Sequence, residues 1–97
     1  MNSDLQFRDA IPEDLPDLVR LLADDPLGSQ RESCTSPLPQ SYESVFEAIN
    51  ADPNNLLLVV EVPGRVVGML QRTFIPYLTY RGSWRALIEG VRVDGEF

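Results

Sequence analysis

The sequence contains no histidine and no lysine, and both absences narrow the chemistry that the chain can perform. Histidine is the commonest general base and the commonest metal ligand, so we expect no metal site. The eight positive charges are all arginines and face fifteen acids, for a formal net charge of −7. Because an acidic surface repels phosphate backbones, nucleic-acid binding is disfavoured. The acids either attract a cationic amine or simply keep the protein in solution.

Cysteine and long apolar runs are also scarce. Cys34 is the single cysteine, so no intrachain disulfide can form, which fits a reducing compartment. Without a histidine to activate it, Cys34 is interpreted as an incidental surface thiol. The longest apolar runs have about five residues, such as 56–60, far short of a membrane span. Residues 1–6 lack the basic and apolar regions of a secretory signal, so we expect a cytoplasmic protein.

The length and composition fit one folded unit. The chain has 97 residues, enough for one domain and not for two. Its hydrophobic fraction of 43% and charged fraction of 24% are ordinary for a folded domain. We therefore expect a single domain over residues 1–97 with a modest core.

The first half of the sequence predicts one strand and two helices. Residues 5–8 alternate apolar and polar side chains, which favours a short strand. Pro12 and the acids after it suit a helix start, and apolar residues then recur at helical spacing until about residue 24. Residues 26–40 carry three prolines and are interpreted as a loop. A second helix is expected from Ser41, as its cap, until Asp52-Pro53 stops it.

The second half predicts three consecutive strands. Residues 56–62 form a continuous apolar run that is typical of a strand covered on both faces. Pro63-Gly64 indicates a tight turn into a partner strand from residue 65 to about 74. Residues 75–82 are interpreted as a connection and 84–93 as the last strand. Short connections between consecutive strands give an antiparallel sheet, and the order strand, helix, helix, strand, strand, strand indicates an α+β fold.

This order and three stretches of local sequence resemble the GNAT superfamily of acyl-CoA N-acyltransferases. Residues 7–16 are similar to the family's opening, where a strand ending in arginine leads into a Pro-Glu-Asp helix start. Residues 57–68 resemble its second and third strands, and 85–93 resemble its fourth strand. The resemblance implies a GNAT-like N-terminal half of order β-α-α-β-β-β, with two helices packed on an antiparallel sheet and a domain truncated after the fourth strand.

The resemblance also implies a coenzyme site and a base. In the family, main-chain groups at the end of the fourth strand hold acetyl-CoA and polarise its thioester; the matching positions are Val91, Arg92 and Val93. Fixed N–H donors there would stabilise the oxyanion of the transition state. Glu89 matches the position of an acid that takes a proton from the acceptor amine, and burial would make it a stronger base. The alternative is a glutamate on a solvated strand face, paired with Arg72 or Arg85.

One departure from the family limits the expected activity. The family's pyrophosphate-binding loop, Arg/Gln-x-x-Gly-x-Gly/Ala, should begin where residues 94–97 stand, and no such motif occurs in the sequence. We expect the 97 residues alone to bind acetyl-CoA poorly and to be inactive, and to transfer acetyl groups to a small primary amine only if completed. The bare last strand favours association, either as a homodimer through the last strands or residues 75–82, or with a complementary C-terminal half.

Two functions without catalysis stay open. The first is an interaction domain, derived from a GNAT, that dimerises through its exposed sheet. The second is a small-molecule binding module that uses the loop at 26–40 together with Tyr77 and Tyr80.

Overall fold

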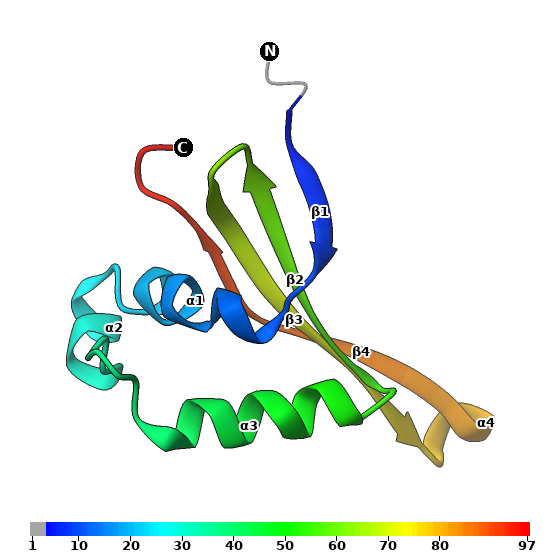
Figure 1. Cartoon of the computed structure of the whole chain (residues 1–97). Coiled ribbons are helices and arrows are strands. Elements are labelled where there is room, and N and C mark those ends of the chain that lie inside the picture. Colours follow the sequence, from blue (N-terminus) through cyan, green and yellow to red (C-terminus); the bar gives the residue numbers. More distant parts are fainter. Residues whose placement is uncertain (1–3) are drawn as a thin grey trace.

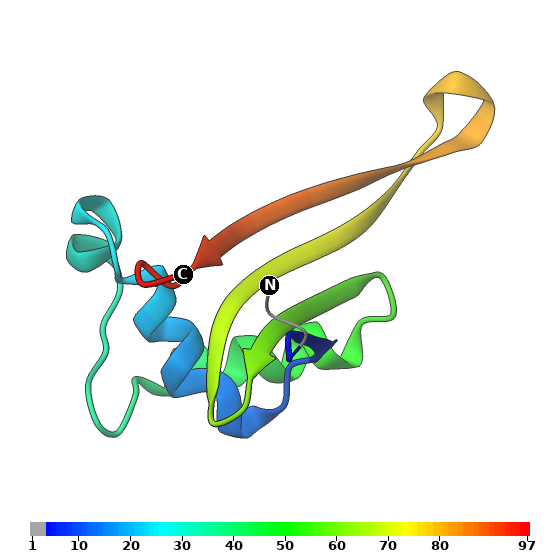
Figure 2. The same ribbon diagram turned by 90° about the horizontal axis from the view of Figure 1, so that it is seen from above.

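The computed structural model describes residues 4–97, which form one antiparallel sheet with its helices on a single face (Figures 1 and 2). The strand order in the sheet follows the sequence, β1-β2-β3-β4, so β1 and β4 are the two edges. The strands are β1 (Gln6–Asp9), β2 (Asn55–Val62), β3 (Arg65–Tyr77) and β4 (Ser83–Val93). The expected α+β class and antiparallel sheet are confirmed.

Two main helices follow β1, as expected, but shorter helical turns accompany them. A 3-10 turn, η1 (Pro12–Asp14), leads directly into α1 (Leu15–Leu22), and α3 (Gln40–Ala51) precedes β2. The loop predicted over residues 26–40 is wrong in its first part, which forms α2 (Pro26–Arg31). Pro26 fits the first helical position there, and the Asp25 carboxylate accepts a hydrogen bond from the Gly28 N–H. A short turn, α4 (Thr79–Gly82), joins β3 to β4.

Both helix starts differ in detail from the expected caps. Ile11 precedes η1 and has no side-chain group that could cap the helix, but its own N–H donates to the Asp14 carboxylate at 2.8 Å. For α3, Ser41 is not the cap, because the helix begins at Gln40 after Pro39. The predicted stop is confirmed, since α3 ends at Ala51 with Asp52 as its C-terminal cap.

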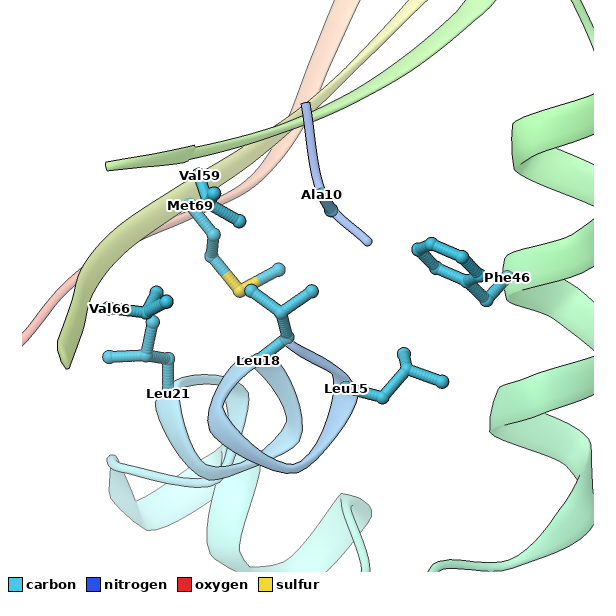
Figure 3. Close-up of a cluster of buried hydrophobic side chains, with 8 residues drawn as sticks. All are labelled: Ala10, Leu15, Leu18, Leu21, Phe46, Val59, Val66 and Met69. Carbon is cyan, nitrogen blue, oxygen red and sulfur yellow. The ribbon is translucent and has the colours of Figure 1, made fainter. Parts of the chain in front are cut away.

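The core lies between α1 and the sheet. Figure 3 shows side chains of α1, α3, β2 and β3 converging there, and Leu18 and Val59 are almost fully enclosed, at 2% and 0% exposed. The buried cluster consists of Ala10, Leu15, Leu18, Leu21, Phe46, Val59, Val66 and Met69. The apolar periodicity of the first helix therefore identified the residues that hold it on the sheet.

The opposite face of the sheet has no helix over it. β2 was expected to be covered on both faces, and that expectation is wrong, because α1 and α3 pack on one face only (Figure 1). On the other face Leu58 and Val60 line a shallow apolar depression together with Phe7, Val91 and Val93. Phe7 and Val93 are 67% and 65% exposed. The apolar run of β2 is thus explained by two apolar faces, of which one is open.

The β3–β4 hairpin extends beyond β2 and leaves the body of the protein (Figure 2). Residues 75–82 were expected to be a connection, but β3 continues to Tyr77 and only Leu78–Gly82 form the turn. β2 pairs with β3 no further than Thr73, so residues 74–86, which we call the arm, form a two-stranded ribbon. The radius of gyration is 14.9 Å, against about 12.5 Å for a compact domain of this length.

Candidate functional site

A bulge divides β4 at the residues where the sequence placed the coenzyme site. Met69 pairs with Arg92 but Gln71 pairs with Glu89, so β4 carries one residue more than β3 between these pairs. Gly90 lies in this bulge with φ of +62°, a left-handed conformation that glycine adopts without strain. Glu89 and the predicted main-chain donors at 91–93 therefore lie next to this bulge, in one short segment of β4.

Main-chain groups just after the bulge point out of the sheet. The Asp94 N–H donates to the Val67 carbonyl at 2.8 Å, while Val93 lies opposite Gly68. Because main-chain groups alternate sides along a strand, the N–H and C=O of Val93 face the open edge, whereas those of Arg92 face β3. Of the predicted donors, Val93 therefore has a main chain available to an added strand or ligand, whereas that of Arg92 is directed at β3.

The side chains of this segment lie on opposite faces of the sheet. Val91 and Val93 line the depression on the uncovered face, at 53% and 65% exposed. Arg92 lies on the helix face, where one guanidinium nitrogen is 3.7 Å from the Asp25 carboxylate. A second nitrogen donates to the Val91 carbonyl at 2.9 Å, and the buried Nε has no hydrogen-bond partner among residues 4–97.

Glu89 occupies the helix face as well, beside Gln71. Its side chain is exposed, so the burial that we expected is not found, and it forms no ion pair within residues 4–97. Neither predicted arginine partner reaches it: Arg72 stacks on Phe74 at 4.0 Å and Arg85 on Tyr77 at 4.1 Å. The carboxylate is thus free to meet a ligand, and its catalytic role stays a prediction.

The end of β4 is anchored to α1 and β3 by Asp94. Its carboxylate lies 3.4 Å from the Arg20 guanidinium and 3.8 Å from that of Arg65. The hydrogen bond from the Glu96 N–H is the main cause that lowers the pKa of Asp94, and the positive charges of Arg65 and Arg20 lower it further. The strand that carries the candidate site therefore has a fixed end.

An apolar groove, which the sequence did not reveal, runs beside this segment between α1 and α3. Its volume is about 320 Å³, and Gln71 lines it from β3. Apolar residues of both helices line the groove, and the side chains of α1 and α3 do not fill the space between them. Phe46 of α3 is buried whereas Val45 is 57% exposed, a difference that periodicity does not predict.

The alternative small-molecule site is not assembled. It required the loop at 26–40 to meet Tyr77 and Tyr80. Figure 1 places α2 and α4 at opposite ends of the molecule, so the structure does not bring these residues together. None of the helices described in residues 4–97 has the length and apolar character needed to cross a bilayer.

Solved structures match the chain over almost its whole length. A protein of Bacillus halodurans C-125 described as a transcriptional regulator is 51% identical with a TM-score of 0.91, and the match covers 95% of this chain and 61% of that protein. An acetyltransferase of Trypanosoma brucei is 25% identical with a TM-score of 0.70, covering 96% and 62%. A predicted acetyltransferase of Clostridium acetobutylicum, solved with acetyl-CoA, is 15% identical with a TM-score of 0.67, covering 95% and 61%.

These matches show that the fold of the chain is shared with proteins described as acetyltransferases. No protein-family model matches the sequence, and no curated protein matches it. The chain spans 61–62% of the length of the three structures named above. The chain is therefore similar in fold to the GNAT superfamily of acyl-CoA N-acyltransferases, and it corresponds to the N-terminal half of that fold.

Proposed function

We propose that the chain forms one half of an acetyltransferase site, which moves an acetyl group from acetyl-CoA to a primary amine once a further segment completes the domain. The observation that carries this proposal is the segment around the bulge in β4. It presents an unpaired carboxylate, Glu89, close along the strand to the outward-facing main chain of Val93. A proton acceptor next to fixed N–H donors is the arrangement that acyl transfer to an amine requires.

The residues have distinct tasks in the proposed reaction. The free edge of β4 at Val93 accepts the extended arm of acetyl-CoA by main-chain hydrogen bonds, as an added strand would. The N–H there stabilises the oxyanion that forms when the amine nitrogen attacks the thioester carbonyl. Glu89 takes the proton released by the amine, directly or through water. The new C–N bond replaces the C–S bond, and the departing thiolate takes up a proton.

We further propose that these 97 residues are inactive by themselves. The sequence has no Arg/Gln-x-x-Gly-x-Gly motif to bind the pyrophosphate of acetyl-CoA. The relatives are longer than the match, and their remaining length is available to supply such a loop. The same missing segment would cover the apolar face that carries Phe7 and Val91.

Fusion to the unmatched C-terminal part of the Bacillus halodurans relative tests this proposal. That protein is 51% identical over the match, so its remaining part should dock on this sheet. We expect calorimetry to show micromolar acetyl-CoA binding by the fusion and none by the 97-residue chain. The unmatched part expressed alone is the control. Equal binding by the chain and the fusion would contradict the proposed inactivity, and no binding by a folded fusion would contradict the proposed site.

A second candidate function, an interaction domain that forms homodimers, is favoured by the composition of the arm. The arm carries Arg81 and Arg85 and no acid, whereas the rest of the chain carries six arginines and fifteen acids. Its tip is also apolar, with Leu78 93%, Tyr80 82% and Trp84 61% exposed. A cationic, aromatic arm fits the acidic body of a second copy, and exposed apolar surface of this kind favours association.

Arm substitutions separate this candidate from the first. We expect the 97-residue chain to sediment as a dimer, and Trp84→Asp to make it a monomer, because the new charge would be buried unpaired in the interface. Leu27→Asp is the matched control: Leu27 is 73% exposed on α2, away from the arm. A monomeric parent chain at high concentration, or a Trp84→Asp variant that stays dimeric, would exclude the arm as an interface.

The regulatory role named for the Bacillus halodurans protein is not carried over to this chain. A net charge of −7 disfavours contact with a phosphate backbone.

A further inference from the structure

The groove between α1 and α3 is lined almost entirely by apolar side chains and is open to solvent. Its base is formed by buried side chains from three elements, Leu18, Phe46 and Met69, at 2%, 5% and 7% exposed. Figure 3 shows Leu15 and Phe46 pointing toward each other from the two helices, with Met69 above them. The rim is accessible, since Val45 is 57% exposed.

Polar groups in the groove are few and are placed at its ends. The side chain of Gln71 lines it from the sheet, and Glu89 lies directly across from Gln71 on the same face of the ladder. Residues opposite each other in an antiparallel pair have Cβ atoms about 5 Å apart, so the Glu89 carboxylate lies beside the groove. The other end is marked by Tyr42, whose hydroxyl donates to Glu32 at 2.7 Å and accepts from the Ser33 N–H.

No charged side chain lines the groove itself among residues 4–97. The nearest charged residues along the β3–β4 ladder therefore decide which charge on a ligand the site favours. Arg72 lies on the opposite face, opposite Ile88, and the guanidinium of Arg85 stacks on Tyr77 instead of pairing with Glu89. Arg92, the next residue of β4 on the helix face, has its guanidinium beside Asp25 and the Val91 carbonyl. A cation bound next to Glu89 would thus meet a negative charge that no arginine neutralises.

We propose that this groove binds the apolar body of the acceptor, and that the acceptor is a primary amine with an aryl or branched alkyl group. The apolar body lies between α1 and α3, and its ammonium group reaches Gln71 and Glu89. This inference rests on the proposed acetyl transfer only in that it calls the bound amine the acceptor. The binding of the amine in the groove does not depend on that transfer. A groove of about 320 Å³ with few polar groups matches the usual character of small-molecule sites.

Binding is favourable for a simple physical reason. Leaving apolar walls in water costs about 25 cal/mol for every Å² exposed, and a flat aryl group removes that water from both helices at once. The ammonium group does not have to be desolvated deeply, because Glu89 is exposed at the mouth. A small hydrophilic amine gains the contact of its ammonium group with Glu89 but not the apolar contact with the two helices. It therefore should bind poorly.

The test uses the 97-residue chain and three probes that differ by one feature each. 2-Phenylethylamine carries both the ring and the charge, 2-phenylethanol lacks the charge and ethanolamine lacks the ring. Amide NMR titration should show millimolar or tighter binding of 2-phenylethylamine with shifts at α1, α3 and Gln71. We expect the other two probes to bind at least about tenfold more weakly. Equal binding of the alcohol, or no binding of the arylamine, would overturn the proposal.

Two substitutions on one helix locate the site. Val45→Arg should weaken binding of 2-phenylethylamine at least about tenfold, because it adds bulk and a like charge at the rim. Ser44→Arg is the matched control, since Ser44 is exposed and does not line the groove. Because Val45 is mostly exposed, its variant should fold, which the amide spectrum checks directly. Parent-like affinity in a folded Val45→Arg variant would place the site elsewhere.

The outcome is separable from that of the acetyl-CoA experiment. If the arylamine binds but the fusion does not bind acetyl-CoA, the groove stands and the proposed transferase falls. If the fusion acetylates ethanolamine as well as the arylamine, transfer stands and the groove is not the acceptor site.

Discussion

Asp14→Ala is expected to lower the free energy of unfolding by about 2–3 kcal/mol, because one carboxylate serves three donors. The Arg8 guanidinium donates to both Asp14 oxygens, at 2.7 and 2.9 Å, and the Ile11 N–H donates at 2.8 Å. Arg8 also binds Glu61 on β2 at 3.0 Å, so the pair ties β1, η1 and β2 together. Asp14 itself is buried, at 6% exposed.

The magnitude follows from the separate contributions. Losing the hydrogen bond to Ile11 removes a helix-start cap, worth about 1 kcal/mol. Breaking a fully buried ion pair by removing one partner costs about 3–5 kcal/mol, and a surface pair contributes about 1 kcal/mol or less. The Arg8 side chain is 31% exposed, so the Arg8–Asp14 pair lies between these limits, at about 1–2 kcal/mol, and the total is about 2–3 kcal/mol. For a domain of this size, such a loss lowers the melting temperature by roughly 10–20 °C.

The same contact makes stability depend on pH in a defined direction. The Arg8 hydrogen bonds, ahead of the Ile11 N–H, lower the pKa of Asp14. A carboxyl whose folded pKa lies below its unfolded value stabilises the fold above about pH 4 and loses that contribution as the pH falls through the folded pKa. We therefore expect the parent chain to lose stability more steeply below about pH 4 than the Asp14→Ala variant does.

Urea unfolding followed by circular dichroism at fixed protein concentration measures both effects. Trp84 fluorescence is a poor probe, because this side chain lies in the exposed arm. Asp17→Ala is the matched control: Asp17 is half-exposed on α1 and forms an ion pair with Arg20 at 3.5 Å. A surface pair of this kind contributes about 0.5 kcal/mol or less. Equal losses for the two variants would show that the Arg8–Asp14 contact does not hold the fold.

The strands and main helices could be predicted because each has a local physical cause. Pro12 with the acids after it starts a helix, Pro63-Gly64 turns the chain, and Asp52-Pro53 ends α3. These signals act within a few residues, so they are legible in sequence. The resemblance to GNAT enzymes then supplied the sheet order, which depends on contacts between residues far apart in the chain.

The features that escaped prediction depend on long-range pairing. Whether Pro76 and Tyr77 belong to a strand or a connection depends on their partners, Trp84 and Ser83, which local patterns do not identify. The face of the sheet that Glu89 occupies likewise depends on the register of β4, which the bulge at Gly90 shifts by one residue. The groove depends on how far apart α1 and α3 lie on the sheet, a relation between elements that periodicity does not contain.

Glu89→Gln, introduced into the completed fusion, is expected to lower kcat about 100-fold while acetyl-CoA affinity stays unchanged. A positioned general base contributes about 10²–10⁴-fold. The lower end applies because Glu89 is exposed in this chain, so that water can take part of its role. Coenzyme affinity should not change, since the proposed contacts to acetyl-CoA come from main-chain groups near Val93, which the substitution leaves in place.

The shape of the kinetic change distinguishes catalysis from support of the strand. Glutamine has the size of glutamate and Glu89 forms no ion pair within residues 4–97, so the melting temperature should not move. Glu43→Gln removes the same charge from an exposed site on α3 and should retain parent kcat. If Glu89→Gln loses stability together with activity, the carboxylate has a structural role. If kcat falls less than about threefold, the proton acceptor lies in the completing segment, and β4 contributes only its main-chain edge.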